Sequence, residues 1–446
     1  MTEATPEMTR ILAAFIVSME PTAIPSTAYD HAKVAFMDWL AVTYGGASDP
    51  LVAKLTAYAK TMGGHPQATL IGQNTKMNVA QAALINGACS HALDYDDTLV
   101  TFFGHPSVTL FPSLLALAEW KEISGFEFLT AYLIGLQAGG TIGRCAGLEH
   151  YMAGWHATST LGHFASAAAC SRLLKLDKTQ TAYALGIAGT QSSGIKRVFG
   201  TMCKPFHAGN ASQTGLMAAL LARDNFSSAE DILEGRHGFF EIMKGKVDPE
   251  VLANLGLGWD VEDISQKYHA SCHATHSPLE AALAIIKEHQ VSIDDIKIIR
   301  VFSSKLALDA AGKLAPTTGL EGKFSIPYCL ANAVIRGETG TSAFTDDNVN
   351  DPKIRDLITR IEVVLDETKT GLEATVKLET INGKQYESFS DILQKIPPLE
   401  VKQDRIEKKF IDLCSAVLET KRVENLIASI NTIDKIDSMK SFAETL

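Results

Sequence analysis

Apolar residues recur at helical spacing along most of the first 265 residues of this chain. Segments such as VAQAALINGACSHALD, FEFLTAYLIGLQAGG and ASQTGLMAALLAR combine this spacing with many Ala and Gly residues. Small side chains let helix axes approach closely, and breaks such as GGHPQ and FHAGN mark connections between helices. We therefore predict a packed domain over residues 1–265 that is helical throughout from residue 5, with the first amphipathic helix inside the stretch MTEATPEMTRILAAFIVSMEPT.

The pattern changes after Ser265. The segment HSPLEAALAIIKEH predicts a helix, whereas IKIIRVFSS, RIEVVLDE and EATVKLETINGKQYESFS are short runs rich in β-branched residues that predict strands. Asn382 and Gly383 separate two of these runs, and because both tolerate the positive φ of a type I′ turn we expect a hairpin there. From about residue 400 the pattern is helical again. The predicted fold class is therefore mainly α: a large helical domain from residues 1–265 and 401–446, and a smaller α+β domain, residues 266–400, inserted between them.

Length and composition narrow the class of protein. The chain has 446 residues, of which 46% are hydrophobic and 20% charged, as is typical of a compact globular protein. Its formal net charge of −11 disfavours nucleic acid as a partner, because a phosphate backbone needs a basic surface. Seven scattered cysteines without a CxxC pair argue against a disulfide framework, a zinc ribbon or an iron–sulfur cluster. No apolar run is long enough to span a membrane and the N-terminus lacks the features of a secretory signal, so we expect a soluble, cytoplasmic protein.

Titratable side chains gather at Gly- and Pro-containing turns. The segment HALDYDDT, residues 91–98, continues into LVTFFGHPS and so brings three carboxylates and two histidines together. A single histidine beside such a turn is usually a surface or capping residue, but the concentration of clusters favours chemistry. Three further clusters are HYMAGWHATSTLG with Tyr151 and His156, GTMCKPFHAGNASQTG with Lys204 and His207, and QKYHASCHATHSP with Lys267, His269, His273 and His276.

One reaction scheme accounts for these clusters jointly. Removing a proton from a carbon next to a carboxylate needs a base, an acid and cations that stabilise the developing charge, and histidine and lysine supply all three without a metal. A helix N-terminus expected after Gly209 and Asn210 suits a substrate carboxylate as well. The three histidines of the last cluster have spacings that suit a metal site on a helix, but Pro278 argues against a helix there, so we expect neither a metal nor a cofactor.

The chain resembles the MmgE/PrpD family, which includes 2-methylcitrate dehydratase, cis-aconitate decarboxylase and iminodisuccinate epimerase. The matching stretches, which cover nearly the whole chain, are HALDYDDT, GHPS, GWHATSTLG, KPFHAG with ASQTGLMAALLA, DILEGRHGFF, THSPLEA and KFSIPYCLANAVIRG. The resemblance implies a homodimer, an inserted lid domain and metal-independent chemistry on small di- and tricarboxylates in a cleft between the domains. Matched by motif, the site comprises Asp94, Thr98, His105, His156, Lys204 and Tyr328.

We therefore expect a cofactor-independent carbon–oxygen lyase that resembles 2-methylcitrate dehydratase. An iminodisuccinate-like epimerase and a cis-aconitate decarboxylase-like enzyme are alternatives, and the second is weakened because Cys272 and the loop between DDT and HPS depart from the decarboxylase pattern. A structural protein without activity is disfavoured because the matched His and Lys residues are all present. The expected catalytic residues are Asp94, His105, Tyr151, His156 and Lys204, and the expected substrate-binding residues are Thr98, His207, Lys267, His273, His276 and Tyr328.

Two of these assignments have explicit alternatives. Tyr151 resembles an acid/base residue of the epimerase-like members, but a packed aromatic near a helix end is an equally good interpretation. Within HALDYDDT, we expect only Asp94 and Thr98 to contact the substrate. Asp96 and Asp97 are interpreted as a cap or a solvated turn, and His91 as part of the preceding helix.

Overall fold

The structure is a computed structural model that describes residues 7–394 and 396–446. It divides into two compact units: unit 1 is the chain up to Gln266 together with Leu399–Leu446, and unit 2 is Lys267–Pro398. In the described ranges, strands form only a two-stranded hairpin in unit 1 and a four-stranded sheet in unit 2, and helices make up most of the rest. The prediction of a mainly α fold with a small α+β insert is confirmed.

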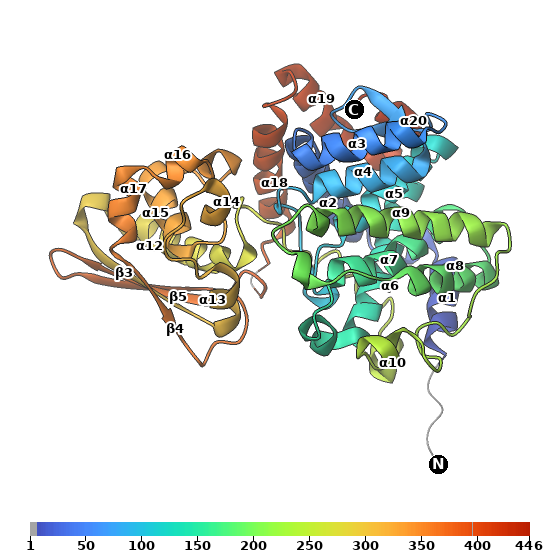
Figure 1. Ribbon diagram of the computed structural model, residues 1–446, viewed down its shortest axis with the longest axis horizontal. Coiled ribbons are helices and arrows are strands. Elements are labelled where there is room, and N and C mark those ends of the chain that lie inside the picture. The colour runs from blue at the N-terminus through green and yellow to red at the C-terminus, as the bar shows by residue number, and fades with distance from the viewer. Residues whose placement is uncertain (1–6, 395) are drawn as a thin grey trace, which may run out of the picture. The chain divides into compact units, whose positions relative to one another are not determined.

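Unit 1 is a bundle of helices (Figure 1), and the side chains buried between them are mostly apolar. Helix α9 packs against both α4 and α7, and α18, from the C-terminal part of the chain, packs against α2. Small residues permit these approaches: a Cβ atom on Gly87 of α4 would lie only 2.7 Å from the Cα of Gly209 on α9. The helices are α1 Met8–Ser18, α2 Ser26–Gly46, α3 Pro50–Met62, α4 Val79–Ser90, α5 Ser107–Lys121, α6 Gly125–Met152, α7 Ala157–Leu173, α8 Lys178–Gln191, α9 Cys203–Arg223, α10 Phe239–Met243, α11 Pro249–Ala253, α18 Leu399–Cys414, α19 Thr420–Asn431 and α20 Met439–Ala443.

Two expectations for this unit are wrong. The chain is not helical throughout, because β1 (Ala68–Leu70) and β2 (Thr75–Met77) pair as an antiparallel hairpin around a Gly-containing turn. No helix begins after Gly209 and Asn210, since both lie inside α9, which starts at Cys203. Gly209 serves the close contact with α4, and the proposed anion site at its N–H groups does not exist.

Unit 2 is an α+β unit. Its sheet has the strand order β4-β3-β5-β6, with β3 and β4 parallel and the other neighbours antiparallel. Helices α12, α15 and α17 lie on one side of this sheet (Figure 1). The elements are α12 His276–His289, β3 Ile296–Ser303, α13 Lys305–Ala311, α14 Gly319–Gly322, α15 Ile326–Arg336, α16 Asp346–Val349, α17 Pro352–Ile358, β4 Ile361–Leu365, β5 Ala374–Thr380 and β6 Gln385–Ser390.

The predicted hairpin joins β5 to β6, but its turn differs from the expected type I′. Gly383 has a φ of +83°, whereas the φ of Asn382 is not positive. The Gly383 N–H donates to the Thr380 carbonyl and the Thr380 N–H to the Lys384 carbonyl, both at 2.9 Å. The loop thus has three residues with one left-handed glycine, a common alternative to the two-residue turn.

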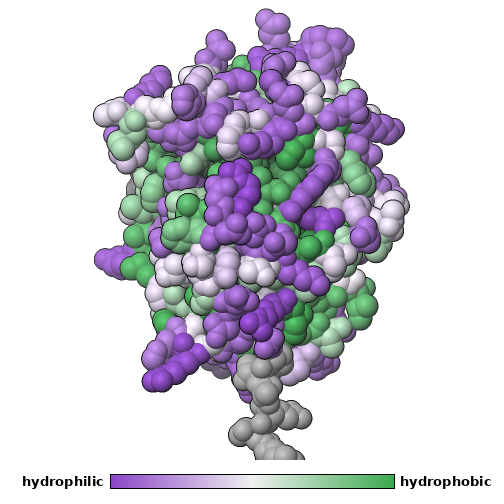
Figure 2. Space-filling model, turned by 90° about the vertical axis from the view of Figure 1, so that its right-hand side faces the viewer, coloured by the Kyte–Doolittle hydropathy of each residue, from purple (hydrophilic) through white to green (hydrophobic). Residues whose placement is uncertain are grey.

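Within the two described ranges, no helix is both long enough and apolar enough to cross a bilayer. On the face drawn in Figure 2, hydrophilic and hydrophobic side chains are interspersed.

Candidate functional site

The segment HALDYDDT connects α4 to α5 in unit 1. His91 caps the C-terminus of α4, and Asp94 adopts a left-handed conformation with a φ of +52°, which Asp tolerates better than most residues. Thr98 then pairs with Ser265 in an antiparallel bridge, with both N–H to carbonyl distances at 2.9 Å. The reversal at Asp94 turns the loop back on itself, so that its carboxylates lie close to the end of α4.

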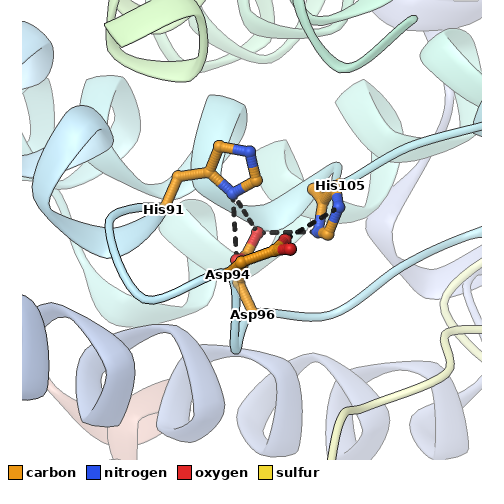
Figure 3. A group of neighbouring side chains, drawn as sticks. All are labelled: His91, Asp94, Asp96 and His105. Carbon is orange, nitrogen blue, oxygen red and sulfur yellow. Dashed lines mark hydrogen bonds and ion pairs between the residues drawn. The ribbon is translucent and has the colours of Figure 1, made fainter. Parts of the chain in front are cut away.

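Asp96 is the centre of a buried histidine–carboxylate cluster (Figure 3). His91 Nδ1 lies 2.9 Å from Asp96 Oδ2 and 3.0 Å from Oδ1, and His105 Nδ1 lies 2.9 Å from Oδ2. Asp96 and His91 are both about 1% exposed. The two imidazoles therefore point at one carboxylate from two sides, and the carboxylate fixes their orientation.

Lys204 approaches the same loop from the first turn of α9. Its Nζ donates to Asp94 Oδ1 at 2.8 Å, and His105 Nε2 lies 3.7 Å from that same oxygen. One carboxylate oxygen thus lies between an ammonium and an imidazole. The side chains of Lys204 and His105 both retain some solvent exposure.

His156 and His207 extend the cluster. Their Nδ1 atoms are 3.0 Å apart, so one of them donates and the other accepts. The His156 ring lies 6.1 Å from that of His91 and 4.9 Å from that of Phe199, measured between centroids. His207 is three residues after Lys204 on α9, which places both on one face of the helix. Four imidazoles, His105, His91, His156 and His207, therefore form a continuous series.

The environment sets the charges of these groups. Burial lowers the pKa of His91 to about 4 and, together with neighbouring charges such as that of Lys204, holds the pKa of His156 well below its usual value. Burial raises the pKa of Asp96, but the charges of His105 and His91 outweigh this and hold it well below its usual range. At neutral pH the site accordingly combines an ionised Asp96 with neutral His91 and His156. Neutral His91 must then place its proton on Nδ1, toward the carboxylate.

Asp97 points the other way, into the core of unit 1. It accepts hydrogen bonds from the Ser107 hydroxyl and, at 3.4 Å, from the Ser107 N–H at the start of α5, and the Ser107 hydroxyl lies 2.9 Å from that of Tyr132. Burial, followed by the charge of Asp38, raises the pKa of Asp97 to about 8. Asp97 is therefore neutral at pH 7, and successive residues of one loop carry carboxyl groups in opposite charge states.

These contacts correct three interpretations of the loop. Asp96 is neither a cap nor solvated, since it is buried between two histidines. Asp97 does contact the first residue of α5 but is not solvated. His91 ends its helix as expected and yet belongs to the cluster. Its spacing of five residues from Asp96 was the available signal, because a helix end followed by a tight turn returns the chain to that position.

Four side chains of the cluster could hold a divalent cation. One ligand atom each from His91, Asp94, Asp96 and His105 lies within 4.8 Å of the others. However, the Lys204 ammonium already lies against Asp94 and supplies a positive charge at this point. The donor set therefore suits a metal less well than four ligands alone would.

The remaining predicted residues of unit 1 have less direct contacts. The Thr98 hydroxyl donates to the Ser265 carbonyl at 3.4 Å, close to the bridge that anchors the loop. Tyr151 lies near the end of α6, where the Lys196 ammonium lies 3.7 Å from the centroid of its ring. This contact fits the interpretation of Tyr151 as a packed aromatic.

The histidines predicted from KYHASCHATH lie in unit 2. His276 begins α12, despite Pro278, because proline is tolerated in the first turn of a helix. The His276 ring lies 4.8 Å from that of His273 and 4.9 Å from that of His269, between centroids. Lys267, His273 and His276 are all less than a tenth exposed. They form a compact cluster, and their role in substrate binding stays a prediction.

Tyr328 is part of the unit 2 core. Its side chain is 0% exposed and its hydroxyl donates to the Ala343 carbonyl. Burial raises the pKa of this hydroxyl, so the group stays protonated. In this structure Tyr328 has no exposed surface to offer a ligand, and its contacts are structural.

Two family models match the chain. The MmgE/PrpD N-terminal domain matches residues 10–252, and the MmgE/PrpD C-terminal domain matches residues 269–435. The first match contains every member of the cluster described above, and the second contains the unit 2 histidines.

Several characterised proteins are similar to the chain over most of its length. A cis-aconitate decarboxylase of Aspergillus terreus is 27% identical over an alignment that covers 95% of this chain and 92% of that protein. The cis-aconitate decarboxylase of Homo sapiens is 25% identical, with 96% and 92% covered. A mitochondrial 2-methylcitrate dehydratase of Yarrowia lipolytica is 25% identical, with 76% and 69% covered.

Proposed function

The chain belongs to the MmgE/PrpD family, and from that premise we propose that it is a lyase that removes a proton next to a carboxylate of a small tricarboxylate. Two named relatives act on acids of this kind, cis-aconitate and 2-methylcitrate. We further propose dehydration as the reaction, with a carbon–oxygen bond broken and no cofactor or metal required.

One observation carries this proposal: His105 and Lys204 flank a single carboxylate oxygen of Asp94, at 3.7 and 2.8 Å. A proton acceptor and a proton donor thus meet at one point, and a carboxylate is already stable there. A substrate carboxylate or hydroxyl that reaches this point contacts both groups. Elimination of water needs such a pair, because one proton leaves carbon while the departing hydroxide gains another.

The residues then have distinct roles. His105 is backed by the ionised Asp96, so a proton on Nδ1 faces the carboxylate and Nε2 is free to accept the proton from carbon. Lys204 binds the substrate carboxylate, stabilises the enediolate-like charge and donates toward the leaving hydroxide. Neutral His156, paired with His207, is a second group that can transfer a proton without adding charge.

Decarboxylation of a cis-aconitate-like acid is the second candidate, because the decarboxylases cover 95–96% of the chain whereas the dehydratase covers 76%. It needs a cation for the departing carboxylate and a proton donor for carbon, which Lys204 and the histidines also supply. Epimerisation of a dicarboxylate is a third, since it needs an acid and a base on opposite faces of one carbon.

Proton NMR of the purified protein with 2-methylcitrate, citrate and cis-aconitate in D2O separates these reactions. Dehydration gives an unsaturated acid, decarboxylation gives an itaconate-like product with carbon dioxide, and epimerisation introduces deuterium into an unchanged skeleton. We expect dehydration that a chelator does not reduce. Loss of turnover in chelator, restored by a divalent ion, would assign a metal to the His91, Asp94, Asp96 and His105 group instead.

We also propose a cytoplasmic homodimer with no nucleic acid or membrane partner. Light scattering of the purified protein tests the oligomeric state directly. A mass of 96 kDa, twice that of the 48.1 kDa chain, is expected, and a monomer would contradict it.

A further inference from the structure

Helix α18 (Leu399–Cys414) carries two buried lysines that the proposed reaction does not use. Lys402 and Lys409 are 0% and 5% exposed. They are seven residues apart, close to two helical turns, so they lie on one face of α18. Lysine is almost never buried unless its charge is paired or its donors are satisfied, so both positions need a reason.

Lys409 holds the turn between the two carboxylates of the site. Its Nζ donates to the Tyr95 carbonyl at 2.6 Å and lies 2.6 Å from Asp38 Oδ1 on α2. The same ammonium lies 3.8 Å from the centroid of the Tyr95 ring. Tyr95 stands between Asp94 and Asp96 in the sequence. The ammonium therefore fixes both the backbone and the side chain of the residue that separates them.

Lys402 holds the segment that pairs with this loop. Its Nζ donates to the carbonyls of Glu262 and Ile264 at 2.9 and 3.0 Å. The next residue, Ser265, pairs with Thr98. One face of α18 thus anchors the loop at Tyr95 and, through this bridge, at Thr98.

We propose that Lys409 is a positioning residue, which holds Asp94 toward Lys204 and Asp96 toward His91 and His105 by fixing the peptide between them. This inference rests on the proposed function. The tight turn makes it specific: Asp94 is left-handed, so a rotation of the following peptide moves both carboxylates at once. Lys409 itself reaches Tyr95 and Asp38, and acts on the reacting groups only through the loop.

The competing explanation is that Lys409 only stabilises the fold by pairing with Asp38. Removing Lys409 alone leaves a buried, uncompensated carboxylate, so loss of folding in Lys409→Met cannot separate the two explanations. The double variant Asp38→Asn/Lys409→Met removes both charges together, so neither is left buried without its partner, while the Tyr95 carbonyl still loses the Lys409 donor. Lys408→Met is the matched control, because Lys408 is the adjacent residue on α18 and forms an exposed pair with Asp404 at 2.7 Å.

We expect the folded double variant to lose at least about tenfold in kcat with KM changed by less than about threefold, since small misplacements of reacting groups can cost up to about 100-fold. Lys409→Arg, which keeps a charge opposite Asp38 and a donor for Tyr95, should recover part of the loss. Lys408→Met should match the wild type. Wild-type kcat in a folded double variant would overturn the proposal. If the double variant does not fold, Lys409→Arg and Lys408→Met are compared instead, and equal kcat in these two would overturn it.

A second readout separates this inference from the proposed function. If wild-type protein turns over none of the acids, the proposed function fails, but nitrogen-15 NMR of labelled histidine still reports the hydrogen bonds of His91 and His105 to Asp96. We expect these resonances to shift in the double variant and to stay in place in Lys408→Met. Unchanged resonances in the double variant would show that Lys409 does not position Asp96.

Discussion

Lys204 Nζ lies 2.8 Å from Asp94 Oδ1, although 110 residues separate the two along the chain. Asp94 reaches this position from the turn after α4, and Lys204 from the first turn of α9. The contact of α4 with α9 at Gly87 and Gly209 brings both together. This pair therefore links the packing of the helices to the chemistry of the site.

Lys204→Met should lower kcat/KM by about 10² to 10⁴, because it removes both a proton donor and the charge that stabilises the transition state. The side chain is 17% exposed, so the variant should fold and unfold at a temperature close to that of the wild type. Initial rates with the best substrate measure the effect. Lys175→Met, at an exposed lysine paired with Glu127, is the control and should keep full activity. A fully active Lys204→Met would contradict the assignment.

Gly87→Ala should lower stability by about 1 to 3 kcal/mol and reduce activity, because the new methyl group collides with the backbone of α9 and forces the helices apart. Urea unfolding and initial rates measure the two effects. Gly258→Ala is the matched control, since an added Cβ there meets no atom within 4 Å. Equal stability of the two variants would show that the α4–α9 contact is looser than described.

His163 should make the fold sensitive to acid. Its side chain is fully buried, and burial lowers its pKa from 6.5 to about 4. Between these values the unfolded chain binds more protons than the folded one, so stability rises with pH across this window and is lost as pH falls. From pH 7 to pH 5 this single group should cost roughly 2 kcal/mol.

Urea unfolding of His163→Gln at both pH values tests this effect. The variant should lose less stability than the wild type between pH 7 and pH 5. His65→Gln, at an exposed histidine, should lose as much as the wild type. The idea fails if both variants follow the wild-type pH dependence.

Asp97 should affect the pH dependence of stability in the direction opposite to His163. Its folded pKa is raised to about 8, so the folded state binds more protons than the unfolded chain between pH 3.8 and 8. The stability this proton provides is complete below pH 3.8 and lost as pH rises through 8. Asp97→Asn, which is neutral at every pH and keeps an acceptor for Ser107, should flatten the decline of unfolding free energy from pH 6 to pH 9. An unaltered pH dependence would mean that Asp97 is already ionised in the wild type.

The sequence predicted the class of fold and most of its elements, because helical periodicity and runs of β-branched residues are local signals. The helix HSPLEAALAIIKEH and the hairpin at Gly383 are confirmed. The hairpin of β1 and β2 was missed because its strands have only three residues each, too few to show an alternating pattern.

The site was predictable only in part. Motif resemblance selected Asp94, His105, His156 and Lys204, which the structure brings into one cluster. The sequence does not identify Asp96 as a site residue, because a carboxylate in a turn usually serves as a cap. Only the tertiary packing shows that Asp96 lies buried between two histidines. The sequence does not show that Lys409 is buried either, because in the run RIEKKF nothing distinguishes it from its exposed neighbour Lys408.

We propose that the cluster around Asp94, Asp96, His105 and Lys204 transfers protons at a carbon next to a carboxylate. Proton NMR of wild type and Lys204→Met with 2-methylcitrate, citrate and cis-aconitate in D2O tests it most directly. Wild-type protein should convert at least one of these acids, and Lys204→Met should convert it at least about 100 times more slowly. No change in any acid with the wild type, or equal conversion by the variant, would contradict it.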